Sequence, residues 1–550
     1  MSVFVIRGNR VDALARCMQP VEIHVQGGKI QDVIPLDGST PDLSLPFLLP
    51  GFIDAHVHIE SSMLVPSAFA ALAVNHGTVA TVSDPHEIAN VNGMEGVRFM
   101  IENGKQVPFK FYFGAPSCVP ATVFETAGDR LDPDQVQSLL EMDEVKYLSE
   151  MMNFPGAIAG DREVLAKIEA AHHLGKPVDG HAPGLRGEAL KEYVSRGIST
   201  DHECFTLEEA LEKLSLGMKI IIREGSAAKN FDALHPLINQ YPDSVMFCSD
   251  DKHPDSLVAG HINQLCARAV ALGHDVFHVI QAACINPVLH YKLDVGLLRK
   301  GDPADMILVD NLYDFNVLAT YINGDKVSEK GVSQIDTSSI RVDPINKFCI
   351  SEIQVSELQM PVSGVYSFPV IGCNDGQLIT DKLMLLPKES DGIWVSDPDK
   401  DVLKIVVVNR YHQAPIAKAF VHGFGLKEGA IASSVAHDSH NIVAVGVDDE
   451  SLCNAINLVI SARGGVSCAD PRKELILPLP IAGLMSSDDG HAVATAYTAI
   501  DLAAKMMGST LSAPFMSLSF MALLVIPNVK LSDKGLFDGE RFVFYQPLQN

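Results

Sequence analysis

Eight short apolar segments in the first half of the chain alternate with stretches of helical pattern. The strand-like segments are residues 50–58, 78–84, 109–117, 144–150, 175–184, 198–203, 218–226 and 244–251. Several of the helical stretches between them end in glycine, as a C-terminal helix cap often does. Eight strands that alternate with helices predict an α/β fold, a parallel sheet closed into a TIM-like (β/α)8 barrel.

Side chains that can bind a metal recur at one place in these segments, the carboxyl end. They are His56, His58, Asp84, Glu150, His181, His202, Glu224 and Asp250. The carboxyl ends of the strands in such a barrel meet on one face, which carries the active site. Scattered structural histidines would have no reason to follow strand ends, so the sequence predicts one site assembled from several strands.

His56 and His58 stand two residues apart in the first strand-like segment, so their imidazoles point to the same side of it. Two neutral imidazoles on one side can hold a divalent cation, although a lone His-x-His is explained equally well by two buried structural histidines. His181 and His202 can hold a second cation. A bridging anion is then needed between the two cations, and a glutamate at the end of the fourth strand is the best candidate.

That glutamate is Glu150, and Asp250 at the end of the eighth strand can bind a metal and accept a proton from bound water. The set combines imidazole with carboxylate and lacks thiolate, which suits zinc, manganese or iron. Coordination to such a cation lowers the pKa of water from about 15.7 to about 7, giving a nucleophile at neutral pH. The residues alone therefore predict a hydrolase with a binuclear metal centre.

Both flanks of the barrel read as short strands and turns. Residues 1–47 contain three such strands, and residues 293–340 return to the same pattern with Asn323-Gly324 as a hairpin signal. We expect the two flanks to form a small discontinuous β-sandwich around a barrel that spans residues 48–292.

Residues 341–550 form a further unit, which we expect to be a C-terminal α/β domain. Its strand-like runs include residues 452–460. Residues 435–442 concentrate His437, Asp438 and His440 within an otherwise apolar stretch. Polar groups gathered in this way are typical of a pocket or an interface, and a capped turn is the alternative. We expect this segment to close over the mouth of the barrel.

Composition excludes several classes of function. The formal net charge of −26 disfavours nucleic acid and anionic membranes as partners. Ten cysteines without any C-x-x-C pair indicate a reducing compartment, and the first residues lack the pattern of a signal peptide, so we expect a cytoplasmic protein. The apolar run between Pro514 and Pro527 is shorter than the roughly 20 residues that span a bilayer, and we expect it to be buried core.

Six segments together resemble the bacterial adenine deaminases of the amidohydrolase superfamily. They are PGFIDAHVHIESS, DPHEIANV, DGHAPGL, TDHE, SDDKHP with the GHI that follows it, and VAHDSHNI. His-x-His marks only the superfamily, whereas DPHEIAN and GFGLKEGAIASSVAHDSHNI are much more specific. The resemblance covers nearly the whole chain. It implies a metal-dependent conversion of adenine to hypoxanthine and ammonia, a step of purine salvage.

The resemblance also implies roles for individual residues. The expected metal ligands are His56, His58, Glu150, His181, His202 and Asp250. The expected catalytic residues are Asp250, Glu150 and Asp84. The expected contacts of the substrate are Arg223, Glu224 and Ser226. A turn before Pro85 would explain Asp84 equally well, and an ion pair would explain Arg223 and Glu224.

The family implies two divalent metal ions, manganese or iron, and the ligand types also admit zinc. We expect a small-molecule purine base as substrate, no nucleic acid, no membrane, and a homodimer or higher homo-oligomer. Two alternatives stay open. A cyclic-amide hydrolase of the same superfamily would bridge its metals with a carbamylated Lys146, four residues before Glu150. A non-catalytic relative that serves as a scaffold would have lost metal ligands, and every matched ligand position is occupied.

Overall fold

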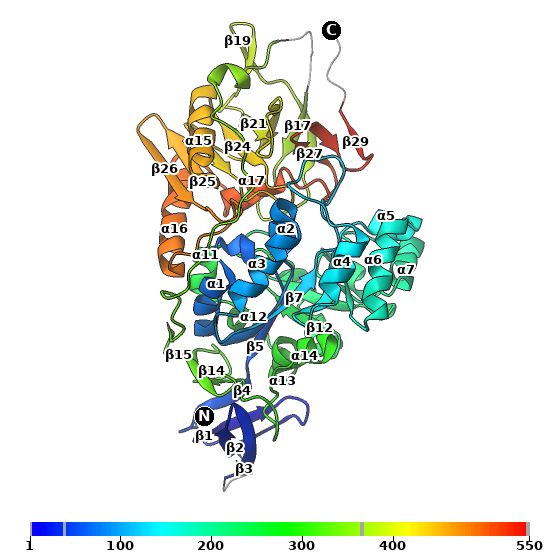
Figure 1. Cartoon of the computed structure of the whole chain (residues 1–550), viewed down its shortest axis with the longest axis vertical. Helices are drawn as coiled ribbons and strands as arrows, with labels where there is room; N and C mark the ends of the chain where they lie inside the picture. Colours follow the sequence, from blue (N-terminus) through cyan, green and yellow to red (C-terminus); the bar gives the residue numbers. More distant parts are fainter. Residues whose placement is uncertain (1–2, 37–39, 363–367, 546–550) are drawn as a thin grey trace.

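The computed structural model describes residues 3–36, 40–362 and 368–545. Three regions succeed one another along the long axis of the molecule (Figure 1): a sheet that holds the N-terminal strands, a central barrel, and a C-terminal unit at the opposite end.

Eight parallel strands form the barrel. They are β5 (Phe52–Val57), β6 (Thr78–Ser83), β7 (Lys110–Ala115), β8 (Val145–Met151), β9 (Val178–Gly180), β10 (Thr200–Asp201), β11 (Lys219–Arg223) and β12 (Val245–Cys248). Hydrogen bonds join β5 to β9 in chain order and β10 to β12 in chain order. Parallel bridges between Val178 and Ile198 and between Val57 and Asp250 connect the two sets. All eight predicted strands are confirmed, and the ring closes between β12 and β5.

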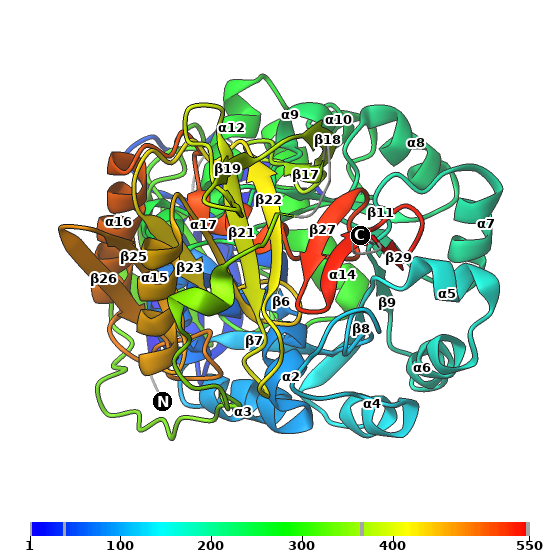
Figure 2. The same ribbon diagram turned by 90° about the horizontal axis from the view of Figure 1, so that it is seen from above.

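Helices follow the strands around the barrel, and Figure 2 shows α4 to α8 spread along one side of it. The helices of this region are α1 (Pro66–Ala73), α2 (His86–Asn92), α3 (Met94–Gly104), α4 (Pro133–Leu140), α5 (Phe154–Ala159), α6 (Arg162–His173), α7 (Gly187–Ser195), α8 (Leu207–Ser215), α9 (Phe231–Leu234), α10 (Leu237–Gln240), α11 (Pro254–Ala259), α12 (Ile262–Ala271), α13 (Val276–Ile280) and α14 (Asn286–Tyr291). Gly197 and Gly217 follow α7 and α8 with φ of 82° and 91°, the left-handed conformation that ends a helix.

Strands from the two flanks form one eight-stranded sheet in the order β16-β15-β14-β13-β4-β1-β2-β3. They are β1 (Val3–Asp12), β2 (Cys17–Gln26), β3 (Lys29–Pro35), β4 (Phe47–Pro50), β13 (Met306–Val309), β14 (Val317–Ile322), β15 (Asp325–Glu329) and β16 (Val332–Ser333). β4 lies between β1 and β13, so residues that we expected at the start of the barrel belong to this sheet. Asn323 and Gly324 connect β14 to β15 with φ of 48° and 78°, which confirms the hairpin.

The C-terminal unit is built on a second eight-stranded sheet, in the order β18-β17-β22-β21-β24-β23-β25-β26. Its strands are β17 (Phe368–Gly372), β18 (Asp381–Leu385), β21 (Val402–Val408), β22 (Ala417–His422), β23 (Ala430–Ser433), β24 (Ile442–Gly446), β25 (Gly465–Asp470) and β26 (Lys473–Pro478). Smaller sheets contain β19 (Lys388–Ser390), β20 (Ile393–Val395), β27 (Val529–Ser532), β28 (Gly535–Asp538) and β29 (Val543–Phe544). The helices are α15 (Asp449–Ser461), α16 (Gly490–Met506) and α17 (Pro514–Phe520).

Helix α15 corrects the prediction that residues 452–460 form a strand. The Asp448 side chain accepts a hydrogen bond from the Ser451 backbone N–H at 2.7 Å, which caps the first turn. The buried residues of the segment recur every three to four positions, the period of a helix with one buried side. Its apolar residues include isoleucine and valine, which are also common in strands, so composition alone was misleading.

The apolar run between Pro514 and Pro527 begins as α17 and continues in turns. Its large side chains are buried, as expected for core. Among the described residues, no helix combines the length and the apolar character that crossing a membrane requires.

A buried lysine connects two neighbouring strand ends of the barrel. Lys213 of α8 is fully buried, and its Nζ donates to Asp201 at 3.0 Å and to Glu209 at 2.7 Å. It also donates to the carbonyl of Ala182 at 2.8 Å. Asp201 ends β10 and Ala182 follows β9, so this lysine holds together the two segments from which strand-end histidines project.

Replacing Lys213 with methionine should destabilise the protein by roughly 3–5 kcal/mol, because Asp201 and Glu209 would stay buried without their cation. The measurement is the thermal unfolding midpoint. Lys191→Met is the matched control, since Lys191 forms an exposed pair with Glu188 on α7, worth at most about 1 kcal/mol. Equal midpoints for the two variants would contradict the role of Lys213.

Candidate metal centre

The structure brings the six expected ligands together at the carboxyl end of the barrel. His56 belongs to β5, Glu150 to β8, and His58, His181, His202 and Asp250 lie just beyond the ends of β5, β9, β10 and β12. All six are more than nine-tenths buried. We call the space that they enclose the metal pocket.

Two of the histidines face one aspartate. The Nε2 atoms of His56 and His58 lie 3.2 Å apart. Asp250 Oδ1 is 3.6 Å from the first and 3.2 Å from the second. Three donor atoms that converge in this way can surround one cation.

The other two histidines face Glu150. His181 Nδ1 and His202 Nε2 lie 2.7 Å and 3.1 Å from Glu150 Oε2. Glu150 Oε1 points back toward His58 Nε2 at 3.4 Å. The carboxylate thus directs one oxygen at each histidine pair, the orientation that a ligand shared by two cations requires.

The donor set fits divalent metal ions. The ligand atoms of His56, His58 and Asp250 all lie within 4.8 Å of one another, and so do those of His56, Glu150 and His202. Imidazole and carboxylate without thiolate accommodate manganese, iron or zinc. Burying four imidazoles and two carboxylates without a bound cation would be costly, because each buried polar group needs a partner in place of water.

Charges inside the pocket keep both carboxylates ionised. Burial would raise the pKa of Glu150, but His181 and the other imidazoles outweigh burial and hold this pKa well below its usual value. Burial likewise opposes ionisation of Asp250, and the Arg223 guanidinium outweighs it and lowers the pKa of Asp250. Asp250 also has φ of 53°, a conformation that residues other than glycine adopt at a cost.

Arg223 alone of the three expected substrate contacts lines the metal pocket. Its guanidinium bonds Asp250 and forms a two-pronged pair with Glu203, with Nη2 3.0 Å from Oε2. Glu224 instead pairs with Arg268 at 3.0 Å, and Ser226 bonds Ser256 at 3.0 Å. The structure does not bring Glu224 or Ser226 to the metal pocket, because Arg268 and Ser256 engage their side chains outside it.

Asp84 reaches the pocket from the end of β6. Its Oδ2 lies 3.2 Å from His86 Nδ1, and the same nitrogen lies 3.5 Å from Glu150 Oε1. The ligand atoms of His58, Asp84, His86 and Glu150 form one group within 4.8 Å. The structure therefore places Asp84 with the ligands, and brings His86 there with it.

The C-terminal unit closes over this pocket, as expected. His437 Nε2 lies 2.9 Å from Asp251 Oδ1, and His440 Nε2 bonds Glu87. Asp438 Oδ1 lies 3.4 Å from His86 Nε2. A loop between β23 and β24 thus supplies part of the wall of a site whose ligands all belong to the barrel.

Sequence reasoning assigned no role to seven residues of the pocket wall. They are His86, Glu87, Met152, Glu203, Asp251, Leu378 and Leu523. Glu203 and Asp251 directly follow two expected ligands, and that position was a usable signal. Leu378 and Leu523 come from remote segments of the C-terminal unit, where an apolar side chain in a pocket looks the same as one in a core.

Known proteins are similar to this chain over nearly its whole length. A family model described as "Amidohydrolase family" matches residues 47–327, and one described as "Adenine deaminase C-terminal domain" matches residues 377–543. A protein named adenine deaminase from Salinibacter ruber is 55% identical over 98% of both chains. Proteins of the same name from Methanosarcina mazei and Borreliella burgdorferi are 50% identical over 97% of both chains and 48% identical over 99% of this chain and 100% of the relative.

Glu150→Gln should lower the metal content from two ions per chain toward one, because the amide keeps the shape but loses the charge between the two sites. Metal analysis of the purified variant measures this. Lys146→Ala is the control, since Lys146 lies at the start of β8, is only partly buried and does not line the metal pocket. Two metals in Glu150→Gln together with one in Lys146→Ala would reverse the assignment of the bridge.

Proposed function

The chain belongs to the adenine deaminase family of the amidohydrolases and converts adenine and water to hypoxanthine and ammonia; we propose that its six strand-end ligands hold two divalent cations for this reaction. The observation that carries the proposal is the position of Glu150, with one oxygen toward His58 and the other toward His181 and His202. Manganese or iron is the proposed metal, and zinc suits the same ligands.

Two such cations, when bound, lower the pKa of coordinated water so that hydroxide is available at neutral pH. Asp250 is the proposed proton carrier. Its Oδ1 faces the ligand nitrogens of His56 and His58, where it can take the proton of the attacking water. It can pass that proton to the ring, and can then carry the second proton of the same water, released from the newly attached hydroxyl, to the leaving amine. Arg223 holds the other oxygen, Oδ2, and keeps the carboxylate oriented.

The polar edge of the base needs partners that Glu224 and Ser226 do not supply. Asp438 Oδ2 is buried in the pocket wall without a hydrogen-bond partner among the described residues, and His86 Nε2 has only the long contacts to Glu87 Oε1 at 3.3 Å and Asp438 Oδ1 at 3.4 Å. A purine presents ring nitrogens and an exocyclic amine, which accept from and donate to such groups. We assign His86 and Asp438 to recognition of the base, and Asp84 to holding His86 in place.

Two features weigh against the alternative functions. A cyclic-amide hydrolase with a carbamylated lysine bridge would need Lys146 at the metals, and the described wall of the metal pocket includes Glu150 but not Lys146. A scaffold without activity would have no reason to keep six converging ligands. We further propose a cytoplasmic homo-oligomer that acts in purine salvage, with a chain organised in three units bounded near residues 47, 292 and 340.

Protein reconstituted with manganese should convert adenine to hypoxanthine with release of one ammonia per turnover. The assay follows the change in ultraviolet absorbance on deamination, with ammonia measured independently. Protein stripped of metal by a chelator should be inactive and should recover activity when manganese returns. Hydrolysis of a cyclic amide by a preparation that leaves adenine unchanged would refute the proposed function.

Asp250→Asn should reduce kcat by roughly 10²–10⁴-fold, the usual contribution of a positioned proton carrier, while most of the metal stays bound. Steady-state kinetics and metal analysis of the same preparation give the two quantities. Asp255→Asn, a partly buried aspartate of α11 outside the metal pocket, is the control and should keep wild-type kcat. Near-normal turnover in Asp250→Asn would move the role to Asp84 or Glu150.

A further inference from the structure

The metal pocket is closed in this structure. Its free volume is only about 20 Å³, enough for roughly one water molecule and far too little for a purine. Each residue of its wall is more than nine-tenths buried. A base can therefore reach the metal ligands only after some part of the wall has moved.

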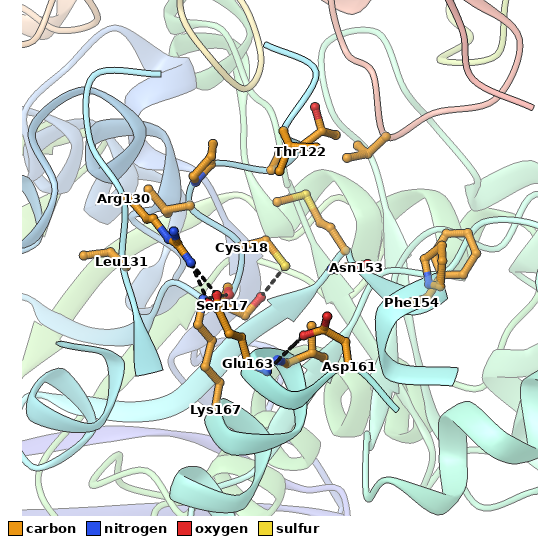
Figure 3. Close-up of a pocket in the computed structure, with 18 of the residues that line it drawn as sticks. Ser117, Cys118, Thr122, Arg130, Leu131, Asn153, Phe154, Asp161, Glu163 and Lys167 are labelled. Atoms are coloured by element: carbon orange, nitrogen blue, oxygen red, sulfur yellow. Dashed lines mark hydrogen bonds and ion pairs between the residues drawn. The ribbon is translucent and has the colours of Figure 1, made fainter. Parts of the chain in front are cut away.

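A much larger cavity adjoins the metal pocket. We call it the side cavity: it is bounded by residues 117–124, residues 152–155, the start of α6, Val525 and Phe542, and its volume is about 670 Å³ (Figure 3). The first two segments follow β7 and β8, so the side cavity lies at the same end of the barrel as the metals. It reaches solvent, because Val123 is 78% and Phe542 is 41% exposed.

Met152 is the residue that lines both spaces. It follows Glu150 by two residues, and its backbone N–H donates to the Glu150 carbonyl at 3.1 Å. The C-terminal unit flanks the same partition, with Leu523 facing the metal pocket and Val525 facing the side cavity. Met152 is thus the side chain that the walls of the closed pocket and the open space beside it have in common.

Met152 can move at a lower cost than the charged part of the wall. Much of the remaining wall consists of charged groups tied to one another, such as Arg223 to Glu203 and His437 to Asp251. Breaking a buried pair of this kind costs several kcal/mol. A methionine side chain has three rotatable bonds and adapts its shape without losing a hydrogen bond.

The side cavity suits a flat, uncharged heteroaromatic molecule. Its walls include Val119, Pro120, Phe154 and Phe542, which offer apolar and aromatic surface. Most of its charged side chains are already engaged: Arg130 pairs with Glu163, as Figure 3 shows, Asp161 caps α6, and Lys167 donates to the Ser117 carbonyl at 2.8 Å. A neutral base could pass along such walls without having to displace a counter-ion.

We propose that the side cavity is the antechamber through which the purine base reaches the metal pocket, and that Met152 is the partition that swings aside. The proposal rests on the proposed function, because it takes adenine as the molecule that passes. It adds a second, transient binding site, about 670 Å³ in volume and free of metal ligands.

Filling the side cavity in steps should slow delivery of adenine in proportion to the volume added. Ala121 lines the cavity, and we would replace it with valine, leucine and tryptophan. We expect kcat/KM for adenine to fall progressively, by roughly tenfold or more for Ala121→Trp, as when access to a site limits capture of substrate. Metal content should stay at two ions per chain and the thermal midpoint should stay near that of the wild type.

The same three substitutions at Ala159 are the matched control. Ala159 is exposed on α5 and does not line the side cavity, so kcat/KM should stay flat across that series. A flat series at Ala121 in metal-loaded, folded protein would overturn the antechamber. So would a fall in kcat/KM that appears only together with loss of metal. Failure of the proposed function is distinguishable, since the wild type itself would then form no hypoxanthine.

Discussion

The contact of Glu150 with imidazoles from three other strands is the interaction on which the site depends. A carboxylate that is almost fully buried would be protonated or unstable alone, and here His181 and His202 approach one oxygen while His58 approaches the other. β9 is the neighbour of β8 in the sheet and β10 is the next strand along, whereas the closed ring brings β5 across to them. The ionised state of Glu150 thus depends on the barrel, because the barrel brings the imidazoles to its carboxylate.

Other buried ion pairs and hydrogen bonds around the metal pocket support that arrangement. The positive charge of Arg223 pairs with Asp250 and Glu203. The positive charge of Lys213 pairs with Asp201, near the ends of β9 and β10. The loop that contains His437 adds contacts from the far side of the pocket. Since buried charges are tolerated only in pairs, each ligand constrains its neighbours, and the site is specified by a network more than by any single residue.

The sequence was sufficient to predict the features that regularly spaced residues determine. Strand-end polar residues predicted the eight strands and the face on which the six converging side chains lie, because alternation and parallel topology leave few other arrangements. It was insufficient where contacts depend on packing between distant segments. Glu224 and Ser226 were expected near the substrate, yet they turn away beyond the end of β11, and α15 was read as a strand because its residue types favour both structures. Leu378 and Leu523 carry no local signal of their place over the pocket.

The residues of the site are synthesised in a fixed order along the chain. Every barrel ligand lies between residues 56 and 250, whereas the side chains that roof the pocket, such as Leu378, His437 and Leu523, are all made later. During synthesis the barrel ligands leave the ribosome well before the roof exists. Cations can therefore meet an open barrel mouth before the C-terminal unit covers it. In the folded enzyme, the C-terminal unit that covers the pocket would also make exchange of its metals slow.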